Sequence, residues 1–440
     1  MTTIYALSSG HGKAGIAVIR ISGPGAGRSL RRLAGTVPPP RTAVLKALRH
    51  PGTDEILDHS LVLWFPAPAS FTGEDVAELH VHGGRAVIER IFRTLGALDG
   101  LRPAEPGEFT RRAFENGKLD LTEAEGLVDL IDAETEAQRR QALRQSSGAL
   151  GALYDGWRTK LVDALASVEA ELDFSDEADV PDAVAGRARI IVTGLCTEIV
   201  AHLADRRGGE ILRDGLRVVI AGLPNAGKSS LMNALARRDV AIVSAEAGTT
   251  RDIIEVRLDL GGFPVILTDT AGIREAGGEI EQEGIRRALQ RAREADLVLW
   301  IGDATEPESV DPAGIDTAPG TPVSRVVNKI DLASPPLPGD AVPISVKTGQ
   351  GLDRLIGQLA DEVRQAADIG ESPAITRARH RRELERCIAA LERFLDGDFS
   401  DPELRAEDLR DAATALGRLT GRVDVEDILD KIFADFCIGK

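Results

Sequence analysis

Five short apolar runs follow one another between residues 215 and 369, and stretches with helical periodicity separate them. Each run has the length and composition of a buried strand: Leu216 to Ala221, Val265 to Thr268, Leu297 to Ile301, Val323 to Val327 and Val342 to Ile344. Strands that alternate with helices in this way are typical of a mostly parallel sheet covered on both faces. Residues 215–369 are therefore predicted to form an α/β domain.

The sequence on both sides of this domain has a different character. Residues 1–118 alternate β-like runs with Gly and Pro breaks around one helical stretch, Arg85 to Leu98, which predicts an α+β domain. Residues 119–214 and 370–440 are helical in pattern. We expect them to form one helical domain that is discontinuous in sequence, because an α/β domain can be inserted at an exposed loop tip.

Shorter patterns within these parts support the division. The β-like runs near the N-terminus are Gly15 to Arg20, Leu61 to Phe65 and Val76 to His82. Apolar residues at helical spacing are Leu161, Leu165, Val168 and Leu172; Ile191, Leu195, Ile199 and Leu203; and Leu384, Ile388, Leu391 and Leu395. A Pro-rich stretch, Leu332 to Pro343, is predicted to be a surface loop.

Composition narrows the possible functions. The 440 residues suffice for about three domains. With 53 basic and 70 acidic residues the formal charge is −17, which excludes general coating of nucleic acid. No apolar run approaches the ~18 residues of a membrane span and the N-terminus lacks a signal-peptide layout, so a soluble, cytoplasmic protein is expected. Three distant cysteines, Cys196, Cys387 and Cys437, argue against a disulfide framework or a cysteine zinc site.

The turn after the first apolar run of the α/β domain carries a phosphate-binding signature. Residues 222–229 are GLPNAGKS, which fits G-x-x-x-x-G-K-[ST] between a strand and the helical stretch Ser230 to Ala236. Glycines let backbone N–H groups wrap around phosphates. Lys228 supplies a cation to the β- and γ-phosphates, and Ser229 offers a hydroxyl to Mg²⁺.

Four further motifs follow in the order that a GTP site requires. Residues 248–250 (GTT) place Thr250 to complete the magnesium shell when a γ-phosphate is present. Residues 269–272 (DTAG) follow the next strand and place Asp269 to hold Mg²⁺ through water.

The last two motifs are predicted to contact the guanine base. Residues 328–331 (NKID) end another strand, and the Asp331 carboxylate can accept hydrogen bonds from guanine N1–H and its 2-amino group, which adenine lacks. Residues 345–347 (SVK) can contact the guanine O6 edge. The five elements resemble those of translation-factor-like GTPases and predict GTP as the nucleotide. The predicted contacts are Asn225, Ala226, Gly227, Lys228, Ser229, Ser230, Ser244, Ala245, Glu246, Ala247, Gly248, Thr249, Thr250, Asp269, Thr270, Ala271, Gly272, Asn328, Lys329, Asp331, Ser345, Val346 and Lys347.

One position departs from the Ras-like pattern. Ile273 follows the DTAG motif, where Ras-type enzymes carry a glutamine that orients the attacking water. An isoleucine cannot orient water, so another group must do so. Asn225 provides a neutral oxygen near the β/γ-phosphates that could help bind a monovalent cation.

Motifs outside the α/β domain resemble those of the MnmE (TrmE) family of bacterial tRNA-modification GTPases. The matching segments are SFTGEDVAE (70–78), PGEFTRRAF (106–114), NGKLDLTEAE (116–125) and the terminal FCIGK (436–440). The resemblance spans the whole chain. It implies an N-terminal domain that binds tetrahydrofolate and dimerises, a discontinuous helical domain and an inserted Ras-like P-loop GTPase domain.

The resemblance also assigns roles to single residues. It implies folate binding by Arg20, Glu78, Lys118 and Lys440, where a carboxylate suits a pterin edge and Arg or Lys suits a glutamate tail. It implies a potassium site at Asn225, Ser244, Glu246 and Thr249, beside Mg²⁺ on Ser229 and Thr250. Glu281 matches the catalytic glutamate thought to order the water, and Lys228 is the second catalytic assignment.

The implied reaction uses two proteins. GTP hydrolysis, stimulated by potassium and by dimerisation of the GTPase domains, accompanies transfer of a one-carbon unit from 5-formyl- or 5,10-methylene-tetrahydrofolate to C5 of the wobble uridine in certain tRNAs. The product carries a carboxymethylaminomethyl group. A homodimer of the chain would act with the flavoprotein MnmG, which brings FAD, in a heterotetramer. The competing hypotheses are a regulatory GTPase of ribosome assembly and a stand-alone folate aminomethyltransferase, although the latter cannot explain the nucleotide motifs.

Three features of the sequence each allow two interpretations. Cys437 is a candidate nucleophile or redox residue, but its apolar neighbours would raise a thiol pKa. The His80-x-His82 pair lacks a third metal ligand in sequence, so a polar strand face, shared with Val76 and Glu78, is preferred over a metal site. A basic cluster is either a solvated face or a contact for tRNA phosphates: Arg377, Arg379, His380, Arg381, Arg382 and Arg386.

Overall fold

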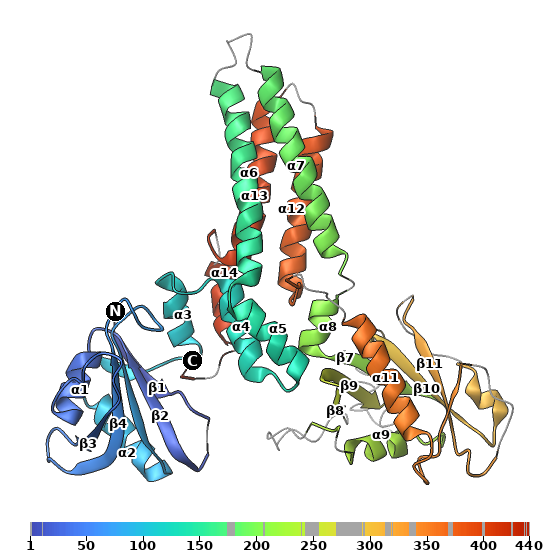
Figure 1. Cartoon of the computed structure of the whole chain (residues 1–440), viewed down its shortest axis with the longest axis horizontal. Coiled ribbons are helices and arrows are strands. Elements are labelled where there is room, and N and C mark those ends of the chain that lie inside the picture. Colours follow the sequence, from blue (N-terminus) through green and yellow to red (C-terminus); the bar gives the residue numbers. More distant parts are fainter. Residues whose placement is uncertain are drawn as a thin grey trace, which may run out of the picture. The chain divides into compact units, whose positions relative to one another are not determined.

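The computed structural model describes residues 2–10, 12–173, 181–205, 207–238, 240–242, 255–269, 293, 295–312, 318, 320–333, 340–367, 373–397, 401–423, 426–434, 436 and 438–439. The chain, whose helices and strands are labelled in Figure 1, divides into two compact units. The first unit is Met1–Val128, Gln145–Ala166 and Ala406–Lys440, and the second unit is Asp129–Arg144 and Ser167–Arg405.

A six-stranded sheet in the order β3-β4-β5-β2-β1-β6 organises the N-terminal part of the first unit. The strands are β1 (Thr3–Leu7), β2 (Ala14–Ser22), β3 (Val44–Arg49), β4 (Ile56–Phe65), β5 (Val76–Gly83) and β6 (Leu101–Pro103). Neighbouring strands are antiparallel except β1 and β6, which are parallel. The three predicted β-like runs lie in β2, β4 and β5, so these predictions are confirmed.

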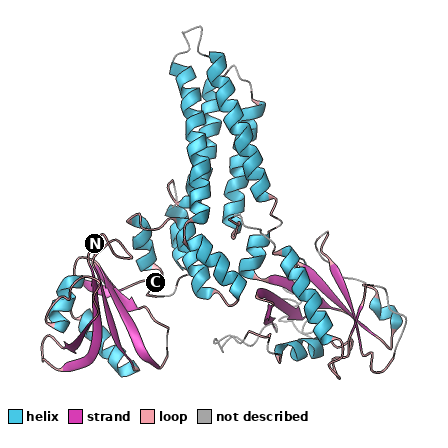
Figure 2. Cartoon of the chain, viewed as in Figure 1, coloured by secondary structure: helices cyan, strands magenta, loops and turns pink. Residues whose placement is uncertain are grey.

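Helices α1 (Ala26–Ala34) and α2 (Arg85–Gly96) pack on this sheet. The apolar residues between them and the strands form one core, with Ile19, Leu79, Leu30 and Ile91 all fully buried. The helix predicted from Arg85 onward is confirmed. Figure 2 shows the strands of this part in magenta with their helices in cyan.

The rest of the first unit is helical. Helix α3 (Glu108–Glu115) and α14 (Glu426–Ala434) contact each other, and α4 (Leu121–Asp132), α6 (Ala149–Asp173) and α13 (Pro402–Thr420) each begin or end in this unit. Residues of two distant segments share one apolar cluster, which contains Leu121 and Ala124 together with Phe433 and Phe436.

The second unit contains a sheet in the order β12-β11-β10-β7-β9-β8. Its strands are β7 (Leu216–Ala221), β8 (Glu255–Leu260), β9 (Phe263–Asp269), β10 (Leu297–Asp303), β11 (Val323–Asn328) and β12 (Val342–Pro343). All pairings are parallel except that of β8 with β9. The five predicted runs are confirmed as β7, β9, β10, β11 and β12, whereas β8 was not predicted.

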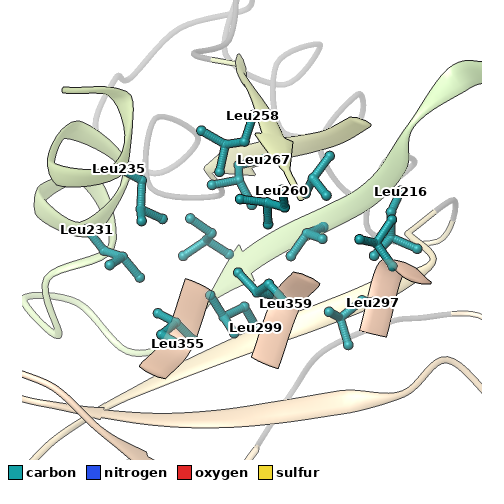
Figure 3. Packing of buried hydrophobic residues seen from close by; sticks show 14 of the residues in the cluster. Leu216, Leu231, Leu235, Leu258, Leu260, Leu267, Leu297, Leu299, Leu355 and Leu359 are labelled. Atoms are coloured by element: carbon teal, nitrogen blue, oxygen red, sulfur yellow. The ribbon is translucent and has the colours of Figure 1, made fainter. Parts of the chain in front are cut away.

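Helices α9 (Lys228–Ala236) and α11 (Leu352–Ala366) supply leucines to the core of this sheet (Figure 3). Leu231 and Leu235 of α9 and Leu355 and Leu359 of α11 are at most 1% exposed. They pack with leucines of four strands: Leu216, Leu258, Leu260, Leu267, Leu297 and Leu299. This core holds the strands together, and the nucleotide-binding motifs lie at the carboxyl ends of these strands.

The helical part of the second unit contains α5 (Glu136–Ser146), α7 (Pro181–Leu203), the short α8 (Gly208–Asp214) and α12 (Ala378–Asp396). Helices α7 and α12 pack against each other, although the sheet of the second unit lies between them in sequence. Both predicted helices are confirmed. Leu195 and Ile199 of the predicted α7 stripe are buried, but Val192 is buried beside them in place of Ile191, which is only partly buried.

No described helix combines the length and the apolar character that a membrane span requires.

The partly buried His202 of α7 makes the stability of the second unit sensitive to acid. Burial lowers the pKa of His202 to about 4. Asp205 favours the protonated form and opposes this shift, whereas His380 and Arg381 lower the pKa further. The unfolded chain therefore binds a proton below pH ~6.5 that the folded chain binds only below pH ~4. We expect up to about 2 kcal/mol of stability to be lost between pH 7 and pH 5 through this residue.

Urea unfolding followed by circular dichroism at both pH values measures this loss. His202→Gln should reduce the difference between pH 7 and pH 5, whereas His59→Gln, which alters an exposed histidine of β4, should leave it unchanged. An equal pH dependence of the parent and His202→Gln would contradict the assignment.

Candidate nucleotide-binding site

The loop that joins β7 to α9 is shaped by two glycines that no other residue could replace. Gly222 has φ +150°, and a Cβ there would lie 2.2 Å from the carbonyl oxygen of Ile301 on β10. Gly227 has φ +100°, and a Cβ there would lie 2.3 Å from the side-chain nitrogen of Asn328. Asn225 between them has φ +63°, a conformation that asparagine tolerates better than most residues. The loop therefore passes close to two neighbouring strands.

Lys228 begins helix α9 and is only 8% exposed. Its Nζ donates hydrogen bonds to the carbonyl oxygens of Gly222 at 3.1 Å and Leu223 at 2.9 Å. The ammonium group is thus held inside the curve of the loop, at a helix N-terminus whose backbone N–H groups favour anions. This arrangement suits phosphate.

Ser229 and Asp269 meet beside the loop. The Ser229 hydroxyl donates a hydrogen bond of 2.6 Å to Oδ2 of Asp269, which is 7% exposed at the carboxyl end of β9. A hydroxyl and a buried carboxylate are hard oxygen donors of the kind that Mg²⁺ uses together with phosphate oxygens. The described residues include no group of three His, Cys, Asp or Glu side chains arranged to hold a metal ion. A magnesium ion here would be held by Ser229 and Asp269 together with phosphate oxygens.

Asn328 connects the phosphate side of the site to the base side. It is 3% exposed, its Nδ2 donates to the carbonyl oxygen of Ala226 at 2.9 Å, and its Oδ1 accepts from the backbone N–H of Val346 at 3.1 Å. One amide therefore fixes the positions of the loop after β7 and of the loop after β12.

The Asp331 carboxylate is oriented from the same side. The buried Ser345 hydroxyl donates to Oδ1 of Asp331 at 2.7 Å and accepts from the backbone N–H of Thr348 at 3.2 Å. Asp331 itself is exposed, so its carboxylate is accessible. Asn328, Asp331, Ser345 and Val346 thus come together as predicted, while Lys347 is exposed beside them.

The sequence did not identify Asp303 as part of this site. Lys329 has φ +66°, and its Nζ lies 2.5 Å from Oδ2 of Asp303 at the end of β10. Burial alone would raise the pKa of Asp303, but hydrogen bonds from Lys329 and Thr305 outweigh it and lower that pKa. The available signal was its place at the carboxyl end of a strand, like Asp269 and Asn328.

Several predicted site residues lie outside the described residues, and their roles stay predictions: Ser244, Ala245, Glu246, Ala247, Gly248, Thr249, Thr250, Thr270, Ala271, Gly272, Glu281, Cys437 and Lys440. Asn225 is therefore the described member of the predicted potassium set.

The predicted folate residues Arg20 and Glu78 lie opposite each other on β2 and β5 of the first unit. Arg20 Nε donates to Glu78 Oε1 at 3.0 Å, and its guanidinium lies 5.3 Å and 5.8 Å from the ring centres of Phe71 and Phe109. Lys118 Nζ donates to the carbonyl oxygen of Pro68 at 3.2 Å. The structure thus places a paired cation and carboxylate beside the partly buried Phe71 and the fully buried Phe109.

The histidines of β5 have acidic partners on the same sheet. His80 Nε2 lies 3.3 Å from Glu78 Oε2, and His82 Nδ1 lies 2.7 Å from Asp58 Oδ1. Burial opposes ionisation of Asp58, but hydrogen bonds from His82 and other neighbours lower its pKa. These pairs agree with the preferred interpretation of a polar strand face, except that Val76 on that face is 2% exposed.

The basic cluster at the start of α12 is largely engaged within the second unit. Arg377 pairs with Asp129 at 2.8 Å, and Arg381 pairs with Asp205 at 2.7 Å. His380 is fully buried. Ion pairs and packing therefore engage these three residues, so the prediction of a solvated face is wrong for them, while the tRNA-contact hypothesis for the cluster stays a prediction.

The strand–loop–helix turn, the Ser229–Asp269 pair and the Asn328–Asp331 region at one edge of a parallel sheet define a P-loop nucleotide-binding domain of the GTPase class. Family models identify the larger relationship: "MnmE helical domain" matches residues 121–437, and "GTP-binding protein TrmE N-terminus" matches residues 3–118. The chain belongs to the MnmE (TrmE) family of tRNA modification GTPases.

Individual relatives support this assignment over the full length. The chain is 59% identical to the tRNA modification GTPase MnmE of Parvibaculum lavamentivorans over 445 residues, and 55% identical to that of Maricaulis maris over 443 residues, with 100% of each chain covered. Among solved structures, it is 29% identical to Era of Aquifex aeolicus over 40% of this chain and 66% of that chain, with a TM-score of 0.27. The family assignment rests on the full-length relatives.

Asp331→Asn should change the base that the site prefers. The substitution replaces an acceptor by an amide that donates, so it should weaken GTP binding at least 100-fold and improve xanthosine triphosphate binding; sites built to hydrogen-bond a substrate can discriminate by ~10⁴–10⁵. Fluorescence titration with both nucleotides measures the change. Asp361→Asn on α11, an exposed partner of Arg364, is the matched control and should bind GTP like the parent. Unaltered GTP affinity in Asp331→Asn would place the base elsewhere.

Proposed function

We propose that this protein hydrolyses GTP during tRNA modification and, with a flavoprotein partner, uses a tetrahydrofolate one-carbon unit to build a carboxymethylaminomethyl group at C5 of the wobble uridine. The observation that carries the GTPase half is the Asn328 amide, which joins a phosphate-binding loop to a guanine-binding region. The tRNA half rests on similarity to tRNA modification GTPases over the whole chain.

The described residues account for how GTP would be held. Lys228 and the N–H groups at the start of α9 neutralise the β- and γ-phosphates. Ser229 and Asp269 would hold Mg²⁺, directly and through water, with Thr250 completing the set; the ion supplies positive charge against the phosphate oxygens. Asp331, oriented by Ser345, selects guanine.

Hydrolysis also needs an ordered water and a charge between the β- and γ-phosphates. We propose that Glu281 orders the attacking water, because Ile273 cannot orient it. We assign the charge to potassium held by Asn225, Ser244, Glu246 and Thr249 when two GTPase domains meet, in place of an arginine finger.

A folate site in residues 1–118 supplies the one-carbon unit. The Arg20–Glu78 pair beside the partly buried Phe71 supports it, because a pterin can stack on an aromatic ring and hydrogen-bond to a carboxylate. Lys118 and the terminal Lys440 are assigned to the glutamate tail. The donor is a 5-formyl or 5,10-methylene derivative of tetrahydrofolate.

We further propose a homodimer that works with the flavoprotein MnmG as a heterotetramer, with FAD bound by the partner and tRNA as the shared substrate. An exposed apolar pair supports self-association of the first unit. Leu45 of β3 and Leu61 of β4 are directly opposite in register, and they are 67% and 43% exposed. The predicted cytoplasmic location and the role of Cys437 stay predictions.

A regulatory GTPase of ribosome assembly is the alternative. It would explain the nucleotide site, but it leaves the Arg20–Glu78 pair and the match of residues 3–118 to the TrmE N-terminal model without a role. The enzyme hypothesis uses both parts of the chain, so we favour it.

A tRNA nucleoside profile tests the function. In a bacterial strain that lacks its MnmE relative, this chain should restore 5-carboxymethylaminomethyl-type wobble uridine, as measured by mass spectrometry. Arg20→Ala should fail to restore it while hydrolysing GTP normally, because the folate cation is lost. Arg32→Ala, which removes an exposed arginine of α1, should restore it fully. Normal GTP hydrolysis without any restored modification by the parent chain would favour the regulatory alternative.

Potassium dependence tests the hydrolysis mechanism. GTP turnover should be at least tens-fold faster in KCl than in NaCl at equal ionic strength, since an arginine finger contributes roughly 10³–10⁵ in rate. Asn225→Ala should remove the difference. Asn225→Gly, which accepts the φ of +63° without strain, should remove it as well and so separate the lost amide oxygen from loop distortion.

Glu281→Ala should slow turnover in both salts and leave GTP binding intact. Equal turnover of the unmodified protein in KCl and NaCl would refute the cation mechanism and leave the GTPase assignment standing.

A further inference from the structure

The β8–β9 hairpin spans from the nucleotide site to the helical part of the second unit. Strand β9 ends at Asp269, which holds the Ser229 hydroxyl, and begins at Phe263 just after the Gly261–Gly262 turn. At about 3.3 Å per residue, its seven residues cover roughly 20 Å. The magnesium end of the site and the hairpin turn are therefore two ends of one paired strand.

The turn is bonded to the first turn of helix α5. The backbone N–H of Ala137 donates to the carbonyl oxygen of Gly262 at 3.0 Å, and Ala137 packs against the apolar core of the sheet. Gly262 has φ +90°, and its own N–H donates to Oδ1 of Asp259 at 2.6 Å, which closes the turn. An N–H in the first turn of a helix has no acceptor within the helix, so the hairpin supplies the acceptor that Ala137 needs.

Strand β8 makes a second contact with the same segment. Arg257 Nη1 lies 3.1 Å from Glu134 Oε2, two residues before α5 begins. The carbonyl oxygen of Arg257 also accepts from the N–H of Ile242 at 2.9 Å. Arg257 therefore joins the sheet edge to Glu134 through its side chain while its backbone pairs with Ile242.

The segment before α5 is tied in turn to the start of α12. Gln138 accepts the N–H groups of Glu134 and Thr135 and donates to the carbonyl oxygen of Arg213 at 2.8 Å. Asp129 accepts from both Arg213 and Arg377. A cavity of about 260 Å³ lies beside these contacts, lined by Asp129, Gln138, Arg213 and Arg257 among others, and it leaves room for them to rearrange.

We infer that the β8–β9 hairpin couples the nucleotide bound at the site to residues 129–144, with Ala137 as the positioning residue at the contact. The inference rests on the proposed function, because its input is the exchange of GTP for GDP at the site. A shift of Asp269 with the magnesium shell moves β9 lengthwise, and the Gly262 carbonyl transmits that shift to α5. Such coupling is reciprocal, so α5 also biases the choice between GTP and GDP.

Hydrogen exchange measured by mass spectrometry on the full chain tests the coupling. Between GDP and a non-hydrolysable GTP analogue, exchange at the amides of residues 138–144 should differ at least ~5-fold, the lower range of typical coupling. Ala137→Pro removes the donor, and proline is tolerated in the first turn of a helix. It should reduce the difference to less than ~2-fold, with the affinity for GDP unchanged.

Glu136→Pro is the matched control, because it places proline one residue earlier and keeps the Ala137 N–H. It should retain the full difference. Arg257→Gln should reduce the difference in part, whereas Arg325→Gln on β11, whose partner Asp340 lies in the same sheet domain, should not. Arg257→Gln decides the case if Ala137→Pro fails to fold.

Two results would overturn the coupling: equal exchange of residues 138–144 in both nucleotide states of the parent, or a full difference in both Ala137→Pro and Arg257→Gln. Nucleotide titration of the same samples separates this from failure of the proposed function. Normal GTP binding without a response in residues 138–144 overturns only the coupling, whereas absence of GTP binding removes both.

Discussion

The buried amide of Asn328 holds the nucleotide site together. Its two hydrogen bonds, to Ala226 and to Val346, join loops that follow different strands of the sheet. Each bond contributes only about 1 kcal/mol net, but a buried polar group left without its partner costs about 1–3 kcal/mol. The close approach of Gly227 to this amide follows from the same geometry, because a side chain at residue 227 would displace it. In the proposed function, phosphate recognition and guanine recognition therefore both depend on this one side chain.

The sheet order explains why these groups can meet. Strand β7 lies between β9 and β10, so the strand order reverses at β7, and the parallel strands present their carboxyl ends at one edge. Asp269, Asp303 and Asn328 are each the last residue of a strand at that edge. The leucine core beneath them keeps the strand ends in register, since close-packed interiors yield little to local strain. The packing of the core thus determines where the residues of the nucleotide site lie relative to one another.

The sequence predicted the parts of this arrangement that local pattern determines. Continuous apolar runs identified β7, β9, β10, β11 and β12, because strands buried on both faces need no polar alternation. It missed β8, an edge strand whose residues alternate between charged and apolar, because Glu255, Arg257 and Asp259 hid its apolar face. The role of Asp303 and the ion pairs of Arg377 and Arg381 depend on contacts between residues distant in sequence. No local pattern records such contacts.

That missed strand also changes how the two parts of the second unit relate. Periodicity indicated an α/β domain inserted at an exposed loop tip of a helical one, and it said nothing of contacts at the junction. The backbone hydrogen bond between Ala137 and Gly262 and the ion pair of Arg257 with Glu134 show that the two parts are in direct contact at this junction. An exposed ion pair contributes at most about 1 kcal/mol, so the backbone hydrogen bond and the packing of Ala137 on the sheet core carry most of this junction. Strand β9 begins at that junction and ends at Asp269. In the proposed coupling, a shift of Asp269 in response to the nucleotide therefore also displaces the hairpin turn that contacts Ala137.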